Sequence, residues 1–314
     1  MNSASLIGGL LGAAILGSTA AFAQTDGAAC KTVHLSDPGW TDITATNGVA
    51  SVVLAALGYT ADIKTLSVPI GYASMKSGEI DVFLGNWMPA QGAFIDDLKK
   101  ADAIEVLTRN LTGAKFTLAV PSYMADKGVK SFADLAAHGD ELDHTIYGIE
   151  PGAPANQNIQ KMLDAGDFGL KGWTLVESGE QAMLAQVERA EKAGKGIVFL
   201  AWAPHPMNEQ FKIDYLAGGD AYFGPDFGGA EVYTLARKGW PEACPNVAGL
   251  FHGMTFDLGM ENTLMGEILS GTDAKDAATA WLKTHPEALT PWLKDVTTLD
   301  GAPAEPAVKA ALGL

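Results

Sequence analysis

The segment VFLGNWMP (residues 82–89) starts with a run of apolar residues, which is typical of a β-strand buried on both faces. Near the end of this run stands a tryptophan, Trp87, which is followed two residues later by a proline. The same pattern returns in VFLAWAP (residues 198–204), and a third tryptophan, Trp40, follows a β-rich run at residues 32–35. Helix-like segments lie between the strand-like ones. This alternation predicts an α/β fold with a largely parallel sheet.

The alternating pattern runs through residues 32–107 and starts again at residue 115. Separate strands are expected at residues 104–107 and 115–121, and the last helix is expected at residues 286–294. No low-complexity segment interrupts the chain, so we expect the crossings between the two halves to be short strands. The sequence predicts two lobes, each a mostly parallel sheet flanked by helices: lobe I comprises residues 24–115 and 219–314, and lobe II, inserted into it, comprises residues 116–218.

The charge balance narrows the possible functions. Among 314 residues, 21 are basic and 37 are acidic, which gives a net charge of −16. A nucleic-acid-binding protein needs a basic surface, so no nucleic-acid partner is expected. The hydrophobic fraction of 47% is ordinary for a folded protein and does not indicate disorder.

The N-terminal segment predicts export from the cytoplasm. Residues 6–21 are small and apolar without a charge, and Ala21-Phe22-Ala23 fits the rule for signal peptidase cleavage. An uncleaved membrane anchor is the alternative, although the segment is short and rich in glycine for a membrane span. We expect cleavage after Ala23 and a periplasmic mature protein.

The two cysteines, Cys30 and Cys244, agree with an oxidising compartment, where a lone pair most simply forms one disulfide. Two free thiols are the alternative. A metal site is not expected, because the spacings of the cysteines and the six histidines match no common ligand motif.

Sequence motifs for catalysis and nucleotide binding were sought. The sequence has no G-x-S-x-G elbow, no G-x-G-x-x-G, no P-loop and no H-E-x-x-H motif. We therefore expect neither an enzyme nor a cofactor, although the absence of motifs does not exclude catalysis.

The three tryptophans at strand ends, Trp40, Trp87 and Trp202, indicate a binding site. Ligands of open parallel sheets bind outside the carboxyl ends of strands, so these rings are expected to meet in the cleft between the lobes. Aromatic faces attract a quaternary ammonium group, and Asp42 is the nearest candidate for a balancing carboxylate. The alternatives are core packing for the rings, a helix-dipole role for Asp42, and a carbohydrate ligand stacked on the indoles.

Six segments resemble the choline-binding proteins of ABC importers, which belong with the glycine-betaine-type periplasmic binding proteins. The resemblance implies a two-lobed binding protein of type II that closes on one trimethylammonium ligand and passes it unchanged to a membrane permease. It also implies an aromatic box of Trp40, Trp87 and Trp202 with Asp42 beside it, and a disulfide between Cys30 and Cys244. The segments are LSDPGWTDI (35–43), DVFLGNWMP (81–89), YGIEPG (147–152), EQAMLAQ (180–186), PHPMN (204–208) and MEN (260–262).

Two positions depart from the pattern of that family. Phe116 stands where the family has a tyrosine that completes the box, and Ala153 stands where it has an asparagine for the ligand's hydroxyl end. Asn156 is a candidate to replace that asparagine, with a helix-capping role as the alternative. A ligand without the hydroxyethyl tail, such as a betaine or trimethylamine N-oxide, therefore gains weight.

From the sequence we expect a monomeric periplasmic protein that captures choline and feeds an ABC permease in the inner membrane. Glycine betaine, trimethylamine N-oxide, carnitine and acetylcholine are the alternative ligands on the same scaffold. A secreted choline-ester hydrolase is the alternative from another class, and a chemoreceptor is a further possible recipient of the closed protein.

Overall fold

The computed structural model describes residues 26–314, so the signal peptide expected at residues 1–23 lies outside the described residues. Strands and helices alternate through this part of the chain, as predicted, and its nine strands form one sheet. The strands are β1 (Thr32–Asp37), β2 (Thr60–Thr65), β3 (Val82–Met88), β4 (Ile104–Pro121), β5 (Thr145–Tyr147), β6 (Thr174–Val176), β7 (Val198–Ala203), β8 (Ile213–Tyr215) and β9 (Gly229–Arg237).

The α-helices lie between these strands and after the last one. Two of them end at Gly166 and Gly194, which have φ of 70° and 63°. Glycine ends a helix well in this left-handed conformation because it has no Cβ to clash. The α-helices are α1 (Thr41–Ala56), α2 (Val68–Ser77), α3 (Gly92–Lys100), α4 (Ser122–Asp126), α5 (Pro154–Ala165), α6 (Glu180–Ala193), α7 (Met207–Gln210), α8 (Asp220–Phe223), α9 (Pro225–Gly228), α10 (Trp240–Ala243), α11 (Pro245–Gly253), α12 (Leu258–Leu269), α13 (Ala274–Thr284), α14 (Leu289–Trp292) and α15 (Ala304–Leu312), and the 3₁₀ helices are η1 (Ala28–Cys30), η2 (Phe132–Leu142), η3 (Asp167–Gly169) and η4 (Pro286–Ala288).

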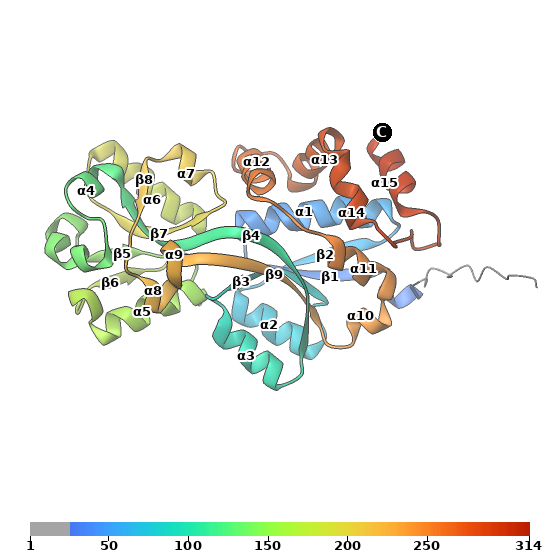
Figure 1. The fold of residues 1–314 in the computed structure, drawn as a ribbon, viewed down its shortest axis with the longest axis horizontal. Helices are drawn as coiled ribbons and strands as arrows, with labels where there is room; N and C mark the ends of the chain where they lie inside the picture. Colours follow the sequence, from blue (N-terminus) through green and yellow to red (C-terminus); the bar gives the residue numbers. More distant parts are fainter. Residues whose placement is uncertain (1–25) are drawn as a thin grey trace, which may run out of the picture.

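The strand order divides the sheet into two parallel groups joined by antiparallel strands. The order is β2-β1-β3-β9-β4-β7-β5-β6, and β8 pairs with β4. β1 is parallel to β2 and β3, and β5 is parallel to β6 and β7. By contrast, β4 and β9 are antiparallel to each other and to their outer neighbours. Figure 1 shows the two parallel groups at opposite ends of the molecule, with β4 and β9 running between them.

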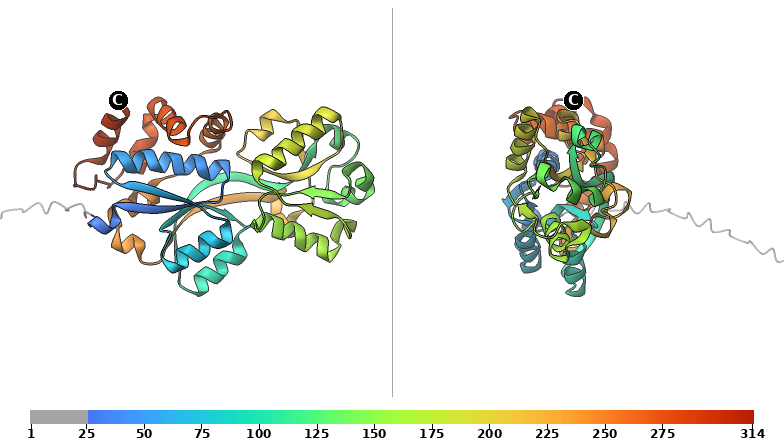
Figure 2. Two further views of the ribbon diagram at one scale, coloured as in Figure 1. Left: turned by 180° about the vertical axis from the view of Figure 1, so that it is seen from behind. Right: turned by 90° about the vertical axis from the view of Figure 1, so that its left-hand side faces the viewer.

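Each parallel group is covered by helices on both faces. At one end α1 and α13 lie on one side of the sheet and α2 and α3 on the other, while at the other end α6 and α5 flank the sheet (Figures 1 and 2). The predicted two-lobed α/β fold is therefore confirmed. We keep the division into residues 24–115 with 219–314 and residues 116–218 as a proposal.

β4 differs from the expectation of two strands at residues 104–107 and 115–121. It is a single strand of 18 residues. Its pairing with β9 shifts register three times, at Val106/Thr108, Arg109/Leu111 and Leu111/Ala114. Extra residues in a bulge bend a strand without ending it, so a stretch that reads as a turn in the sequence continues the sheet. The first crossing between the lobes is thus a long bulged strand.

The helix expected at residues 286–294 is divided into η4 and α14. Pro291 lies inside this range and lacks the backbone N–H that a continuous helix requires there. The short strands β6 and β8 and the C-terminal helix α15 were not anticipated. β6 and β8 have only three residues each, which is too short for a clear alternating pattern.

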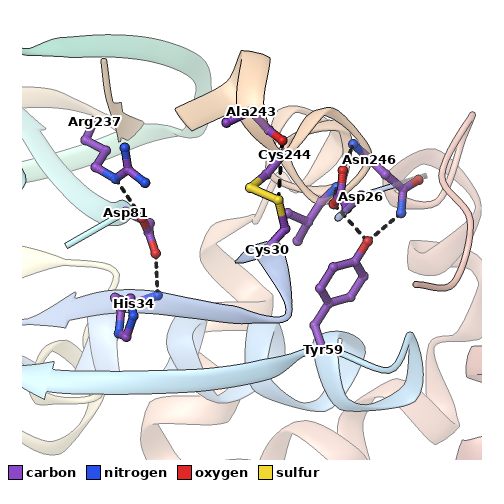
Figure 3. Close-up of a disulfide and its surroundings, with 10 residues drawn as sticks. Asp26, Cys30, His34, Tyr59, Asp81, Arg237, Ala243, Cys244 and Asn246 are labelled. Atoms are coloured by element: carbon purple, nitrogen blue, oxygen red, sulfur yellow. Dashed lines mark hydrogen bonds and ion pairs between the residues drawn. A yellow bond between two sulfur atoms is a disulfide. The ribbon is translucent and has the colours of Figure 1, made fainter. Parts of the chain in front are cut away.

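The expected disulfide between Cys30 and Cys244 is present, with Cα atoms 5.6 Å apart, and joins η1 to the segment between α10 and α11 (Figure 3). Beside it, the Asp26 carboxylate accepts hydrogen bonds from the backbone N–H groups of Asn246 and Val247, both at 2.9 Å. These groups lie in the first turn of α11, so Asp26 caps that helix. The start of the described chain is therefore tied to α11 both covalently and by hydrogen bonds.

α1 lies at the centre of its lobe and is buried along most of its length. It packs against α12 and α13, and Gly48 permits the closest approach, because a Cβ there would lie 2.7 Å from the Ala274 carbonyl oxygen. The N-terminal end of this fixed helix points toward the other lobe (Figure 1). Within residues 26–314, no helix is both long enough and apolar enough to cross a membrane.

Candidate functional site

A pocket at the junction of the two lobes is lined by most of the residues that the sequence singled out. Trp40 and Asp42 come from the start of α1, Trp87 from the end of β3, and Phe116 and Trp202 from β4 and β7. All three tryptophans therefore stand at or just beyond strand ends. The structure brings these five residues to one place.

The aromatic rings are held by the sheet and by neighbouring rings. Phe116 and Trp202 are direct cross-strand partners of β4 and β7, so they stand side by side on one face. Phe116 is backed by Phe223, with ring centroids 5.6 Å apart. Each of the four pocket rings is less than a tenth exposed. The sheet and the Phe223 ring therefore hold Phe116 and Trp202 in place.

Among residues 26–314, Asp42 is the one carboxylate in the pocket lining. It is 3% exposed, and the Trp87 indole N–H donates a hydrogen bond of 3.0 Å to its Oδ2. Burial, with the negative charge of Glu180 as a second cause, raises the pKa of Asp42 to about 7. The Trp87 hydrogen bond acts in the opposite direction but does not cancel the effect of burial. Asp42 thus changes its charge near neutral pH.

Gln91, an amide in the pocket lining, already makes three hydrogen bonds within the protein. Its Oε1 accepts hydrogen bonds from the Tyr72 hydroxyl and from Asn86, and its Nε2 donates to the Gly85 carbonyl at 2.8 Å. The remaining wall is apolar and includes Ile149 and Ala155. The pocket therefore offers a ligand several aromatic faces and one carboxylate.

Further acidic groups lie close to the pocket. Trp40 donates its indole N–H to Glu150, and Thr41 donates its backbone N–H to Glu180. Burial raises the pKa of Glu150, and it raises the pKa of Glu261 well above its ordinary range. The neighbouring Asp42 charge is the second cause for Glu261. Because the acidic groups oppose each other's ionisation, this environment favours a positively charged ligand.

Asn156 is the one predicted contact that the structure places outside the pocket lining. Its Oδ1 accepts the Ile149 backbone N–H at 3.0 Å, and its Nδ2 donates to the Ile149 carbonyl and to the Glu150 carbonyl, both at 2.9 Å. The amide therefore holds the loop in front of α5. A direct contact between Asn156 and a ligand stays a prediction.

Glu150 contacts Trp40, Glu180 contacts Thr41 and His205 contacts Trp202. The sequence did not name these three residues as part of the site. All three stand in segments that carried the family resemblance, YGIEPG, EQAMLAQ and PHPMN. These segments were recognised by their similarity to the family. No periodicity or spacing in the sequence indicated that their charged side chains would lie close together. Among residues 26–314, no cluster of three or more histidine, cysteine, aspartate or glutamate side chains could hold a metal ion.

A family model described as the substrate-binding domain of an ABC-type glycine betaine transport system matches residues 31–284. The chain also resembles a solved ABC-transporter choline-binding protein in complex with choline. The identity is 54%, the match covers 91% of this chain and 99% of the other, and the TM-score is 0.90. A second solved structure is an ABC-transporter choline-binding protein in an unliganded semi-closed conformation. Its sequence is also 54% identical to this chain, the match covers 91% of this chain and 100% of the other, and the TM-score is 0.84.

A more distant relative is the glycine betaine/carnitine transport binding protein of Listeria monocytogenes. It is 28% identical over 52% of this chain and 53% of its own length. The resemblance that the sequence motifs indicated is confirmed by these matches.

Proposed function

The chain belongs to the family of substrate-binding domains of ABC-type glycine betaine transport systems, and from this premise we propose that it captures choline between its lobes and delivers it to an ABC importer. The observation that carries the ligand class is the pocket itself, where Trp40, Trp87, Phe116 and Trp202 surround a space that has Asp42 as its lining carboxylate. A choline-binding protein 54% identical over nearly the whole chain supports choline as the first choice.

The chemistry of a quaternary ammonium group fits these walls. The group has a positive charge but no N–H to donate, so hydrogen-bond acceptors gain little from it. The negative face of an aromatic ring attracts such a cation by about 0.5–2 kcal/mol, and by more when water is excluded. Phe116 and Trp202, held side by side in the sheet, lose little freedom on binding, which favours affinity further. Asp42 balances the charge beside Trp87.

The charge around the pocket favours choline over ligands that carry a carboxylate. The sequence departures at Phe116 and Ala153 give weight to a betaine, but a betaine carboxylate would enter a region that already contains Asp42, Glu150 and Glu180. Like charges in a buried site disfavour one another. We therefore rank choline and acetylcholine above glycine betaine and carnitine, with trimethylamine N-oxide between them.

The ligand's tail is expected to contribute little to affinity. Phe116 has no hydroxyl, Ala153 has no side-chain donor, and the Gln91 amide is occupied by Tyr72, Asn86 and the backbone. The tail would therefore face mainly apolar wall. Recognition rests on the trimethylammonium head.

We also propose that the mature protein begins after Ala23, works as a monomer in the periplasm and meets its permease at the inner membrane. The disulfide between Cys30 and Cys244 supports an oxidising compartment. Binding and release without chemistry on the ligand is the expected mode of action. Incubation with acetylcholine should then release no acetic acid.

A thermal-shift panel tests the ligand class, because a ligand that binds only the folded state raises the melting temperature. Choline should give a large shift and glycine betaine a small one, with glucose as the uncharged control. A shift with glucose and none with any quaternary amine would overturn the proposal.

A further inference from the structure

We propose that two carboxylates of lobe II, Glu150 and Glu180, act as a latch that holds the cleft closed by accepting hydrogen bonds from the N-terminal end of α1 in lobe I. The inference rests on the proposed function, because closure is what retains the ligand. Beyond that function, Glu150 and Glu180 are assigned the role of positioning residues, which hold the N-terminal end of α1 and Trp40 in the closed cleft.

Glu180 caps α1 from the opposite lobe. The N-cap position of α1 is Trp40, whose side chain makes no capping hydrogen bond. The backbone N–H of Thr41 instead donates to Glu180 Oε2 at 3.0 Å, and the Thr41 hydroxyl donates to Glu180 Oε1. The first N–H groups of a helix have no partner within it and attract negative charge. Closure therefore gives α1 the cap that its own sequence lacks.

His205 holds Glu180 in place for this contact. The backbone N–H of Met207 donates to His205 Nδ1 at 2.9 Å, so the proton of the ring is on Nε2. That nitrogen lies 3.2 Å from Glu180 Oε1. The His205 ring also packs edge-on against Trp202, with centroids 5.0 Å apart. The latch is thus joined to a wall of the pocket.

Glu150 holds Trp40, another wall of the pocket. The Trp40 indole N–H lies 3.0 Å and 2.9 Å from the two carboxylate oxygens of Glu150. Asn156 fixes the backbone of this loop through the Ile149 N–H and the Glu150 carbonyl. The Asn156 amide thus positions the residue that orients Trp40.

The latch is coupled to the cation by electrostatics. Closing the cleft brings Glu180 close enough to Asp42 for its charge to raise the pKa of Asp42. Without a cation this proximity opposes closure, whereas a bound ammonium group offsets it. Opening removes the hydrogen bonds to Trp40 and Thr41 together. Closure is therefore favourable when the pocket is filled.

The test compares choline dissociation rates in wild-type protein with those of Glu180→Ala and Glu150→Ala, measured by stopped-flow tryptophan fluorescence. Glu180→Gln serves as a second variant that keeps the side-chain volume. Glu188→Ala, an exposed position on α6 that pairs with Lys192, is the matched control. Thr41→Val, alone and combined with Glu180→Ala, completes a double-mutant cycle. Small-angle X-ray scattering reports the closed fraction of each variant with and without choline.

Hydrogen bonds to a charged group predict a roughly tenfold faster dissociation in Glu180→Ala and in Glu150→Ala, with little change in Glu188→Ala. The effect of Thr41→Val should shrink when Glu180 is already alanine. Dissociation rates and closed fractions equal to those of Glu188→Ala would overturn the latch even though choline still binds.

A wild-type protein that does not bind choline would instead refute the proposed function. The latch is then judged on the closed fraction of the ligand-free protein in Thr41→Val, which removes a donor to Glu180 and leaves the charge of Glu180 in place. That fraction should be lower than in wild type, and an equal fraction would overturn the latch.

Discussion

Replacing Asp42 with asparagine should weaken choline binding at neutral pH and remove its dependence on pH. In the unmodified protein the Trp87 indole N–H donates a hydrogen bond of 3.0 Å to the Asp42 carboxylate. The substitution keeps the shape of the side chain and leaves an oxygen that can accept this hydrogen bond. It removes only the charge. The variant therefore separates the electrostatic contribution of Asp42 from its part in the architecture of the pocket.

The magnitude follows from the pKa of Asp42, which burial and then the charge of Glu180 raise to about 7. Only the ionised form attracts the cation. With that pKa, about a tenth of the protein is ionised at Asp42 at about pH 6, and about nine tenths at about pH 8. The apparent dissociation constant varies inversely with the competent fraction, so the affinity should rise roughly tenfold over this interval. The affinity for choline decreases correspondingly as the pH falls through about 7.

Isothermal titration calorimetry in buffers of different ionisation enthalpy measures both the affinity and the protons released. Wild-type protein should release a fraction of a proton per choline near neutral pH, and Asp42→Asn should release none. Burial also raises the pKa of Asp37, Glu150 and Glu261, so these groups are the possible competing sources. An equally steep pH profile in Asp42→Asn would show that one of them titrates instead and would refute the reasoning.

Three other changes test the pocket and the fold. Trp87→Ala or Trp202→Ala should weaken choline binding at least about tenfold through the loss of one desolvated aromatic face, with an unchanged circular dichroism spectrum; an unchanged affinity in both variants contradicts the aromatic pocket. Tetramethylammonium should bind within about threefold of choline by calorimetry, a difference of less than one net hydrogen bond, because the tail meets apolar wall; a hundredfold gap would reveal a tail contact. Replacing Cys30 and Cys244 with serine should lower the free energy of unfolding by roughly 2–5 kcal/mol in urea titrations; an unchanged midpoint would mean that the disulfide contributes nothing.

The convergence of the tryptophans could be predicted because it depends on a rule of topology. Trp40 and Trp87 stand at carboxyl ends of strands in one parallel group, and Trp202 stands at the end of a strand in the other group. Ligands bind outside the carboxyl ends of strands, so rings from the two groups are expected to meet in the cleft between them. The position of Asp42 could be predicted together with that of Trp40, because both residues lie at the start of one helix. Phe116 was recognised only by its resemblance to a family position. Its pairing with Trp202 could not be predicted, because it depends on the register between β4 and β7.

The contacts between the lobes could not be predicted in the same way. Glu150 and Glu180 lie more than a hundred positions along the chain from Trp40 and Thr41, so no local pattern links the donor to the acceptor. The single strand β4 was also missed, because bulges break the alternation on which strand prediction depends. Asn156 was named as a candidate to replace the family asparagine that is missing at Ala153. Its hydrogen bonds to the backbone of Ile149 and Glu150 depend on a loop conformation that no local pattern indicates, and its contact with the ligand stays a prediction.

The central claim is that the rings at the junction of the lobes hold a quaternary ammonium group. A crystal structure of the mature protein with choline tests it most directly. The trimethylammonium nitrogen should lie within about 6 Å of the ring centroids of Trp40, Trp87 and Trp202, with the Asp42 carboxylate beside it. Choline bound away from these rings, or an empty pocket at saturating choline, would contradict it.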